Sequence, residues 1–310
     1  MIRLHVTDTG VSVRSTTTRT RRTRIPEGLP TMNLIVHPQM QQRSDEWFDI
    51  RRGLVTASTV KDLLTTRRLT AIDHTCPSCQ TPAGDPCIGA RGGPIKTMHT
   101  ERTAKAKSTS SPLIIEPASN DASRGLTKRL VAERITGESS SNTFMTDDMW
   151  RGVEHEPYAR DRYAEVNGVT VEQVGFMVRE VDGIRWGCSP DGLINTDGML
   201  EVKCPRPATH IDTIIADAVP IEHMPQLQCA LLTSGRQWID FVSFVAGLPL
   251  YTKRVFPDVR WTRPILDAIR QFEANAIERQ RLYAEAAEGL PSTEAIHYID
   301  LDNSPVRLKL

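Results

Sequence analysis

The sequence has no long apolar run, no net charge and no regular cysteine pattern, and each absence excludes a class of protein. No apolar stretch approaches the ~18 residues that a membrane-spanning helix needs, and the N-terminus has no apolar core of a signal peptide. The 38 basic residues balance 38 acidic ones, so any surface for nucleic acid must be local. Six unevenly spaced cysteines do not form a secreted disulfide framework. We therefore expect no membrane association and a reducing, cytoplasmic setting.

The remaining composition is that of an ordinary globular protein, apart from the first thirty-one residues. With 39% hydrophobic and 25% charged residues, a chain of 310 residues can form one large domain with an insertion. Residues 1–31 scatter arginines among Ser and Thr with almost no apolar residue, which predicts a disordered basic tail. Such a tail can contact phosphates non-specifically, or it can be a solvated extension upstream of a true start at Met32.

Residues 187–205, GCSPDGLINTDGMLEVKCP, contain the strongest chemical signal in the chain. The turn residues at 195–198 predict a tight hairpin that places Asp191 beside Glu201. Because strand side chains alternate, Glu201 and Lys203 project from the same face. Two carboxylates and a lysine suit a hard divalent cation, with the ammonium orienting a water molecule. The alternative is a common turn followed by a solvated strand face.

These residues resemble the PD-(D/E)xK nuclease signature as it occurs in the lambda-exonuclease-like, YqaJ-type viral recombinase family. The matching motifs are the SPDGL run that contains Asp191 and the LEVKCP run that contains Glu201 and Lys203. A second block, W-x₃-R-x-G-x₂-T-A-S at 47–58, is similar to the first block of the same family. The resemblance implies that Arg51 and Ser58 contact the terminal 5′-phosphate of DNA. Ser58 has the alternative role of N-cap to a following helix.

Two further blocks complete the implied active site. Residues 150–160 are similar to the G-x₃-E-x₂-A-R block, which places its acid at Glu156 and leaves Glu154 as the alternative. Pro157 is compatible with this block only if a helix begins near it. The predicted helix at 221–232 contains a Q-x-Q pair, and the resemblance places Gln226 next to the catalytic lysine.

The resemblance implies one set of roles for these residues. Mg²⁺, or Mn²⁺, would be held by Glu156, Asp191, Glu201 and the backbone carbonyl of Val202. Lys203 would position the attacking water, and Gln226 would restrain the lysine. An exposed polar helix face is the alternative for Gln226, and a surface glutamate at a helix start is the alternative for Glu156.

Residues 69–111 predict a small inserted module with a metal site of its own. Cys76, Cys79, Cys87 and His99 form a C-x₂-C-x₇-C-x₁₁-H pattern in a segment too poor in apolar residues for its own core. Four such ligands fit one structural Zn²⁺ in tetrahedral geometry, and the pattern resembles small zinc-finger modules of phage and actinobacterial proteins. Free thiols and an iron–sulfur cluster are the alternatives.

Basic residues surround these ligands and indicate contact with duplex DNA, with ordinary solvated charge as the alternative. They are Arg91, Lys96, Arg102, Lys105 and Lys107.

The predicted fold is α/β, with a restriction-endonuclease-like core in which helices flank a central mixed sheet. Residues 32–68 and 112–310 form this core, and residues 69–111 are the zinc-binding insertion. Short β-rich runs are expected near 169–171, 176–178, 184–186, 200–203, 238–245 and 250–255. Apolar spacing predicts helices over 123–136 and from 261 onward, the latter with an apolar stripe that reaches Leu282.

The function implied is that of a Mg²⁺-dependent exodeoxyribonuclease that degrades duplex ends from 5′ to 3′ in phage-type recombination. The family further implies a homotrimer, a single-strand annealing protein as partner and, for a phage-encoded chain, the host cytoplasm. Two other classes stay open, namely an endonuclease or repair nuclease on the same core and a non-catalytic DNA-binding protein. Comparing the cleavage of linear duplex with that of circular duplex distinguishes an endonuclease or repair nuclease from the exonuclease.

Overall fold

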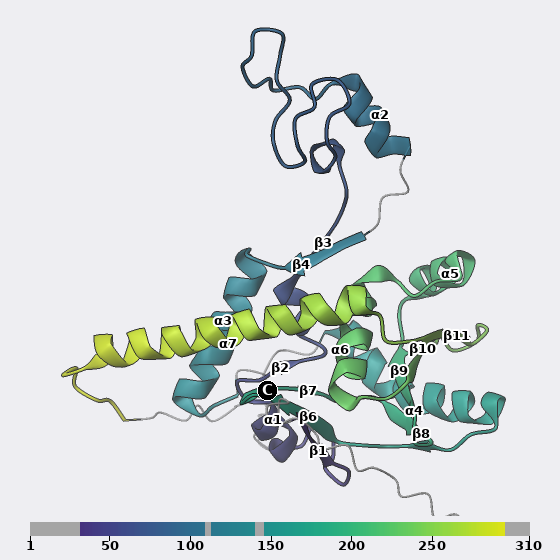
Figure 1. Ribbon diagram of the computed structural model, residues 1–310. Coiled ribbons are helices and arrows are strands. Elements are labelled where there is room, and N and C mark those ends of the chain that lie inside the picture. Colours follow the sequence, from purple (N-terminus) through teal and green to yellow (C-terminus); the bar gives the residue numbers. More distant parts are fainter. Residues whose placement is uncertain (1–31, 109–112, 140–145, 295–310) are drawn as a thin grey trace, which may run out of the picture.

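The structure is a computed structural model that describes residues 32–108, 113–139 and 146–294 (Figure 1). The predicted basic tail, residues 1–31, lies outside the described residues. The α-helices are α1 (Asp45–Arg51), α2 (Thr100–Ser108), α3 (Asp121–Thr136), α4 (Asp147–Asn167), α5 (Pro207–Ala216), α6 (Met224–Ser234) and α7 (Val259–Ala287). Short 3₁₀ helices are η1 (Val60–Leu63), η2 (Ala71–Asp73) and η3 (Ile221–His223). Across these ranges no helix is both long and apolar enough to cross a bilayer.

The strands form a four-stranded sheet, a five-stranded sheet and a separate pair. The first has the order β1-β6-β7-β2, the second β11-β10-β9-β8-β5, and the pair is β3-β4. Their bounds are β1 (Met32–His37), β2 (Val55–Thr56), β3 (Leu64–Arg68), β4 (Leu113–Pro117), β5 (Val171–Glu172), β6 (Phe176–Val181), β7 (Ile184–Cys188), β8 (Gly192–Ile194), β9 (Gly198–Lys203), β10 (Trp238–Ser243) and β11 (Tyr251–Val255). β2 pairs with β7 and β9 with β10 in parallel, whereas the other pairings are antiparallel. The predicted mixed α/β architecture is therefore confirmed.

Two tight hairpins determine the register near the site. Val181 of β6 lies opposite Ile184 of β7, and the two residues between them have positive φ angles of 52° and 80°. Ile194 of β8 lies opposite Gly198 of β9. Gly198 is required there, because an added Cβ would lie 2.2 Å from the Trp238 ring. This packing keeps the β8–β9 turn close to β10.

The helices cover the sheets with their apolar faces. Figure 1 shows α7 as a long helix that crosses α3 and passes above the strands. Its buried stripe consists of Trp261, Ile265, Ala268, Ile269, Phe272 and Ala276. Leu282, the last residue of the predicted apolar stripe, is 51% exposed and lies outside its buried part. Figure 1 shows that α7 extends beyond the core at its C-terminal end.

α4 begins ten residues before Pro157, so the prediction of a helix start near that proline is wrong. Thr146 caps the N-terminus by accepting a hydrogen bond from the backbone of Met149, and Gly168 ends the helix with a left-handed φ of 62°. Both caps and the packing of Ala159 and Tyr163 into a core cluster stabilise the helix despite its internal proline. Tertiary burial therefore offsets the backbone hydrogen bond that Pro157 cannot donate.

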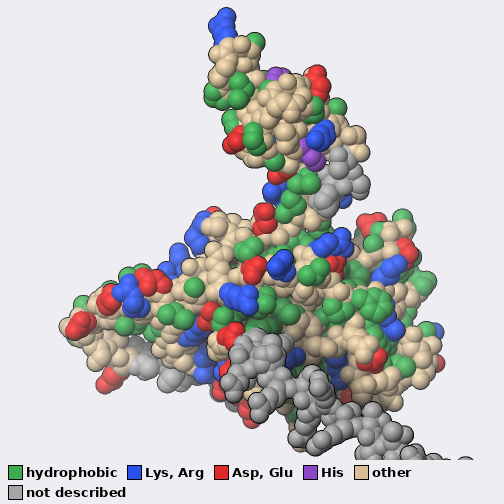
Figure 2. Space-filling model, viewed as in Figure 1, with side chains coloured by type: hydrophobic (Ala, Val, Ile, Leu, Met, Phe, Trp, Pro, Cys, Tyr) green, Lys and Arg blue, Asp and Glu red, His purple; other side chains and the backbone are tan. Residues whose placement is uncertain are grey.

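The β3–β4 pair connects the core to a small projecting unit that contains α2 and η2. β3 and β4 pack against α7, and α2 contacts η2 within the unit itself. Figures 1 and 2 show this unit standing clear of the rest of the molecule at the far end of the β3–β4 pair.

Candidate active site and metal-binding module

The β8–β9 hairpin brings Asp191 and Glu201 together at the end of the five-stranded sheet. The backbone of Asp191 donates to the carbonyl of Leu200 at 3.0 Å, which continues the ladder past β8. Its carboxylate accepts a hydrogen bond of 2.6 Å from the backbone N–H of Val202. The predicted hairpin is confirmed, and it places two carboxylates from positions ten residues apart on one side of one strand pair.

Lys203 and Gln226 form a hydrogen-bonded network with Glu201. The ammonium of Lys203 donates to Glu201 Oε1 at 2.6 Å and to Gln226 Oε1 at 3.0 Å. The amide of Gln226 in turn donates to Glu201 Oε1 at 2.5 Å. Because an ammonium has three donors, these two bonds fix its position and leave one N–H for a water or a phosphate oxygen. The helix α6 thus brings Gln226 beside the lysine, where the resemblance placed it.

The electrostatics of this site favour a bound cation. Burial, together with repulsion from Glu201 and Glu156, raises the pKa of Asp191 well above its usual value. Burial also raises the pKa of Glu201, against the opposing attraction of Lys203. Burial alone would lower the pKa of Lys203, but the attraction of the carboxylates outweighs it and the pKa is raised. Crowded, desolvated carboxylates are a donor set that a divalent cation stabilises, so Asp191 and Glu201 fit Mg²⁺.

Glu156 faces the same cavity from α4 but does not close a tight triad. Its carboxylate pairs with Arg160 at 2.5 Å, and its charge raises the pKa of both Asp191 and Glu201. In the described ranges, the three carboxylates do not form a set with all ligand oxygens within 4.8 Å of one another. Glu154 is exposed and does not line the cavity, so Glu156 is the better placed of the two.

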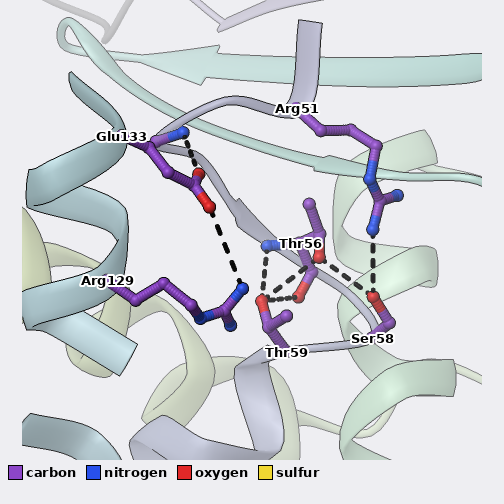
Figure 3. Close-up of polar contacts among 7 residues, drawn as sticks. Arg51, Thr56, Ser58, Thr59, Arg129 and Glu133 are labelled. Carbon is purple, nitrogen blue, oxygen red and sulfur yellow. Dashed lines mark hydrogen bonds and ion pairs between the residues drawn. The ribbon is translucent and has the colours of Figure 1, made fainter. Parts of the chain in front are cut away.

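Figure 3 shows Arg51 beside Ser58, and both residues line this cavity. The guanidinium of Arg51 donates to Ser58 Oγ at 3.4 Å and stacks on the Trp47 ring at 3.8 Å. Burial lowers the pKa of Arg51 to about 10, so the group stays charged at neutral pH. Trp47 is a packing residue whose indole N–H donates to Ser189 Oγ at 2.8 Å.

Ser58 does not cap a helix, and that alternative is wrong. The following 3₁₀ helix η1 has Thr59 as its N-cap residue, without a side-chain capping bond. The hydroxyl of Ser58 instead lies 3.0 Å from Thr56 Oγ1, and Thr59 Oγ1 accepts from the backbone of Thr56 (Figure 3). Thr56 is hydrogen-bonded to both Ser58 and Thr59 within this short loop, so the Ser58 hydroxyl can face the cavity.

Gly53 of the same motif anchors α1 to α3. Its N–H donates to Glu133 at 2.8 Å, and its carbonyl accepts from Arg134 at 2.8 Å. Arg134 also forms a bidentate ion pair with Glu273 of α7, at 2.6 and 2.8 Å. An added Cβ on Gly53, whose φ is +66°, would lie 2.4 Å from Arg134 Cγ. The motif glycine therefore determines where Arg51 is held.

The site residues line one cavity of about 1070 Å³, together with residues that sequence patterns did not single out. His223 stacks on Phe241 at 5.4 Å, and burial, aided by the charge of Lys203, lowers its pKa to about 4. His223 is therefore neutral at pH 7. Its only sequence signal was its position just before the Q-x-Q helix.

Three charged residues at the cavity wall were also missed. Asp148 at the start of α4 accepts from Arg151 at 2.9 Å and from Arg206 at 3.0 Å. The i,i+3 spacing of Asp148 and Arg151 is visible in the sequence, but the contact with Arg206 is not, because Arg206 follows β9 and reaches the start of α4 only in the fold. The two guanidiniums add positive charge to a cavity whose floor is acidic.

The second glutamine of the Q-x-Q pair has a structural role. Gln228 is fully buried, donates to the carbonyl of Phe256 and accepts from the backbone of Asp258, both at 2.8 Å. It thereby holds the junction between β11 and α7 against α6. Only the first glutamine of the pair faces the cavity.

Cys76, Cys79, Cys87 and His99 converge in the projecting unit. Their ligand atoms all lie within 4.8 Å of one another, which no other set of three or more metal-binding side chains achieves in the described ranges. The Thr81 hydroxyl and the Ile88 N–H lower the pKa of Cys79 to about 5, so its thiolate form is favoured. Three cysteines and one histidine in this arrangement fit tetrahedral zinc.

Comparison with solved structures places this fold among nucleases. The crystal structure of an alkaline exonuclease, LHK-Exo from Laribacter hongkongensis, aligns with 27% identity and a TM-score of 0.56. The alignment covers 79% of this chain and 99% of that one. The structure of LHK-Exo in complex with dAMP aligns over the same shares, with 28% identity and a TM-score of 0.54. The fold and the acid–lysine site thus define an α/β protein of nuclease fold.

Two family models then match particular parts of the chain. Residues 105–237 match the YqaJ-like viral recombinase domain. This stretch of the chain contains Glu156, Asp191, Glu201, Lys203 and Gln226. Residues 42–117 match a model described as "Putative DNA-binding phage zinc finger domain", which contains the cysteine–histidine cluster. No curated protein matches the chain significantly. Both resemblances inferred from the sequence motifs are confirmed over these residues.

Proposed function

We propose that the protein is a Mg²⁺-dependent exodeoxyribonuclease that degrades one strand of duplex DNA ends from 5′ to 3′, in recombination. The observation that carries the proposal is the network of Asp191, Glu201, Lys203 and Gln226 in one cavity. Support comes from the match to a viral recombinase domain and from the likeness to an alkaline exonuclease.

In this proposal each side chain has a defined task at the scissile phosphate. Glu156, Asp191, Glu201 and the carbonyl of Val202 would hold Mg²⁺, which would supply Lewis acidity at the scissile phosphate. Lys203, held by Glu201 and Gln226, points its remaining N–H at the attacking water. Gln226 restrains the ammonium without itself gaining or losing a proton.

Arg51 and Ser58 bind the terminal 5′-phosphate in this proposal. A guanidinium stacked on Trp47 is held in one orientation, so little side-chain entropy is lost when it binds phosphate oxygens. The adjacent Ser58 hydroxyl adds a neutral donor. Binding the end phosphate at one side of the cavity sets which phosphodiester lies over the carboxylates.

The cysteine–histidine cluster holds one structural Zn²⁺, and the unit that contains it contacts duplex DNA outside the cavity. The arrangement of its four ligand atoms supports the zinc assignment. The description of the matching zinc finger domain as DNA-binding supports the second part. Zinc content of the purified protein, measured by elemental analysis with Cys87→Ser alongside, tests the first part. An iron signal with visible absorbance would instead favour a cluster.

A homotrimer and a single-strand annealing partner complete the proposal, on the family resemblance alone. A ring encloses DNA and lets an exonuclease stay on one strand through many cleavages. Light scattering of the purified protein measures its mass in solution. A monomeric mass at working concentration would remove the ring from the proposal while leaving the nuclease assignment in place.

The deciding experiment is digestion of matched linear and circular duplexes, with and without Mg²⁺, and with or without a 5′-phosphate on the linear substrate. We expect the linear duplex to be degraded faster with a 5′-phosphate than with a 5′-hydroxyl, the circular duplex not to be cleaved, and no degradation after chelation. Cleavage of closed circles would establish an endonuclease on the same core. Binding without cleavage of any substrate would establish a non-catalytic DNA-binding protein, which the buried acid network argues against.

A further inference from the structure

The projecting unit has no hydrophobic core, and an arginine takes its place. Within residues 71–108 the buried side chains are Cys76, Thr81, Cys87 and Arg102. Arg102, on α2, is fully buried and is by far the largest of the four. Burial of a guanidinium without a strong compensating interaction is costly, so its surroundings have to explain its position.

The guanidinium of Arg102 holds three separate segments of the unit together. It donates to the carbonyls of Ile72 and His74, which precede the first cysteine, at 3.0 and 2.7 Å. It also donates to the carbonyls of Pro82 and Asp85, between the second and third cysteines, at 2.9 and 2.8 Å. The planar guanidinium therefore joins these segments by hydrogen bonds where a larger domain would use apolar packing. Through this one side chain, α2 is connected to the loops that contain the cysteines.

The same guanidinium contacts a proposed zinc ligand directly. Nη1 of Arg102 donates to Cys87 Sγ at 3.3 Å. No Asp or Glu forms an ion pair with Arg102 in the described parts of the chain. Carbonyl oxygens satisfy its donors but supply no formal negative charge. The negative charge that faces Arg102 is therefore that of the thiolate.

Formal charges at the site are complementary. Three thiolates and a neutral imidazole around Zn²⁺ sum to a net charge of minus one, and Arg102 brings plus one. Each charge is costly to bury alone, and at a separation of 3.3 Å they stabilise each other in a region of low dielectric. Outer-shell partners of this kind commonly tune metal affinity about 10–100-fold.

We propose that Arg102 is the charge counterpart of the zinc–thiolate site, a positioning residue that couples zinc binding to the folding of residues 71–108. The proposal rests on the zinc assignment above and goes beyond it, since it concerns how this chain stabilises the loaded site. Without metal, the unit has neither an apolar core nor a bound ion to join its loops, so we expect it to fold only when the site is filled.

The first test compares three full-length variants by competition for zinc with a chromophoric chelator. We expect Arg102→Gln to weaken zinc binding at least ~10-fold, Arg102→Lys to weaken it less, and Lys107→Gln to leave it unchanged. Lys107 is an exposed residue of the same helix and controls for a general loss of charge. If the lysine variant binds zinc no better than the glutamine variant, or if Arg102→Gln matches the parent, the proposal is overturned.

A second test separates charge from simple structural support with a double-mutant cycle. Cys79→His changes the formal charge of the loaded site from minus one to zero, and Cys79 is only half-buried, so an imidazole has space there. In that background, Arg102→Gln should cost much less zinc affinity than in the parent, because the arginine has lost its counter-charge. Equal losses in both backgrounds would show that Arg102 acts only as scaffold.

The outcomes are distinguishable from a failure of the zinc assignment itself. A parent protein that binds no zinc in the competition refutes the zinc site, whatever the variants do. If the parent binds zinc and Arg102→Gln binds it with the same affinity, only the role of Arg102 is refuted. Co²⁺ absorption of each variant, read as thiolate-to-metal bands, checks that the Arg102 and Lys107 variants keep the ligands of the parent and that Cys79→His loses one thiolate.

Discussion

At the scale of single residues, the candidate active site is a set of charges that stabilise one another. Glu201 is 3% exposed and accepts hydrogen bonds from both Lys203 and Gln226. Removing one member of such a buried network leaves the others unpaired. Variants of these residues should therefore be compared by both cleavage rate and DNA affinity.

Lys203→Ala and Asp191→Asn are each expected to reduce cleavage at least ~100-fold while leaving DNA affinity within a few-fold of the parent. The reason is that, in the proposed function, both side chains act on the transition state rather than on the bound duplex. Single-turnover cleavage and filter binding measure the two quantities. Lys128→Ala, an exposed lysine far from the cavity, is the matched control. Parental cleavage rates in Lys203→Ala would refute the active-site assignment.

Arg51→Ala is expected to slow digestion strongly on 5′-phosphorylated duplex and little on 5′-hydroxyl duplex, so that the two rates converge. The end phosphate distinguishes the substrates, and Arg51 is the group proposed to bind it. Rates on both substrates at one stated salt concentration measure the effect, and Ser58→Ala should shift them less in the same direction. Equal slowing on both ends would instead indicate a general backbone contact.

At the scale of elements, the position of α1 depends on a contact with α3 that a single glycine permits. Gly53 is held through both of its backbone polar groups by Glu133 and Arg134, and Arg134 is itself clamped to α7. Arg51 lies two residues before this anchor. The placement of Arg51, which is proposed to bind the DNA end, therefore depends on packing among α1, α3 and α7.

Gly53→Ala is expected to destabilise the protein more than Gly137→Ala, as measured by Tm. Both glycines have left-handed φ angles, +66° and +73°, but only at Gly53 would a Cβ meet Arg134, whereas at Gly137 nothing lies within 4 Å. The backbone strain of about 1–2 kcal/mol is common to both, and the overlap adds about 1–3 kcal/mol at Gly53 alone.

The same pair of variants tests whether the anchor supports end binding. Gly53→Ala should reduce the preference for 5′-phosphorylated ends, because Arg51 moves with α1, whereas Gly137→Ala should keep it. Equal Tm values for the two variants would show that Arg134 moves aside without cost. If Gly53→Ala keeps the parental preference for 5′-phosphorylated ends, the contact of Gly53 with α3 does not determine the position of Arg51.

At the scale of the whole molecule, the chain combines two parts with different sources of stability. The larger part has extensive apolar clusters, in which Phe241, Ile265 and Phe272 are almost completely buried. The projecting unit has none of its residues in these clusters and holds its fold through cysteines, a histidine and Arg102. The two parts should therefore respond differently to loss of metal.

Removal of zinc by a strong chelator, or by Cys87→Ser, is expected to make residues 69–111 sensitive to protease while the larger part stays resistant. A unit without an apolar core loses its fold with its metal, whereas the apolar clusters are untouched. Limited proteolysis with mass analysis of the fragments measures the outcome. Cys204→Ser, a thiol outside the unit, should change neither zinc content nor the cleavage pattern. Equal resistance of both parts after zinc loss would contradict the prediction.

The features that the sequence determined by itself are those whose residues lie close together along the chain. Asp191 and Glu201 meet because one short turn joins β8 to β9, and strand alternation places Lys203 on the side of Glu201. The cysteine–histidine set is recognisable for the same reason, since knuckle spacing restricts the possible geometry. Local backbone rules were sufficient for these features.

Features that depend on packing between distant segments were decided only by the tertiary structure. Pro157 lies inside α4 because burial of Ala159 and Tyr163 overrides its local preference. Ser58 is no helix cap, because the loop that contains it bonds to itself and faces Arg51. Arg102 was predicted to be one of the basic residues that contact DNA, with solvated charge as the alternative, and both are wrong because it is fully buried. Periodicity and propensity describe neighbours along the chain, whereas burial and charge pairing depend on which segments the fold brings together.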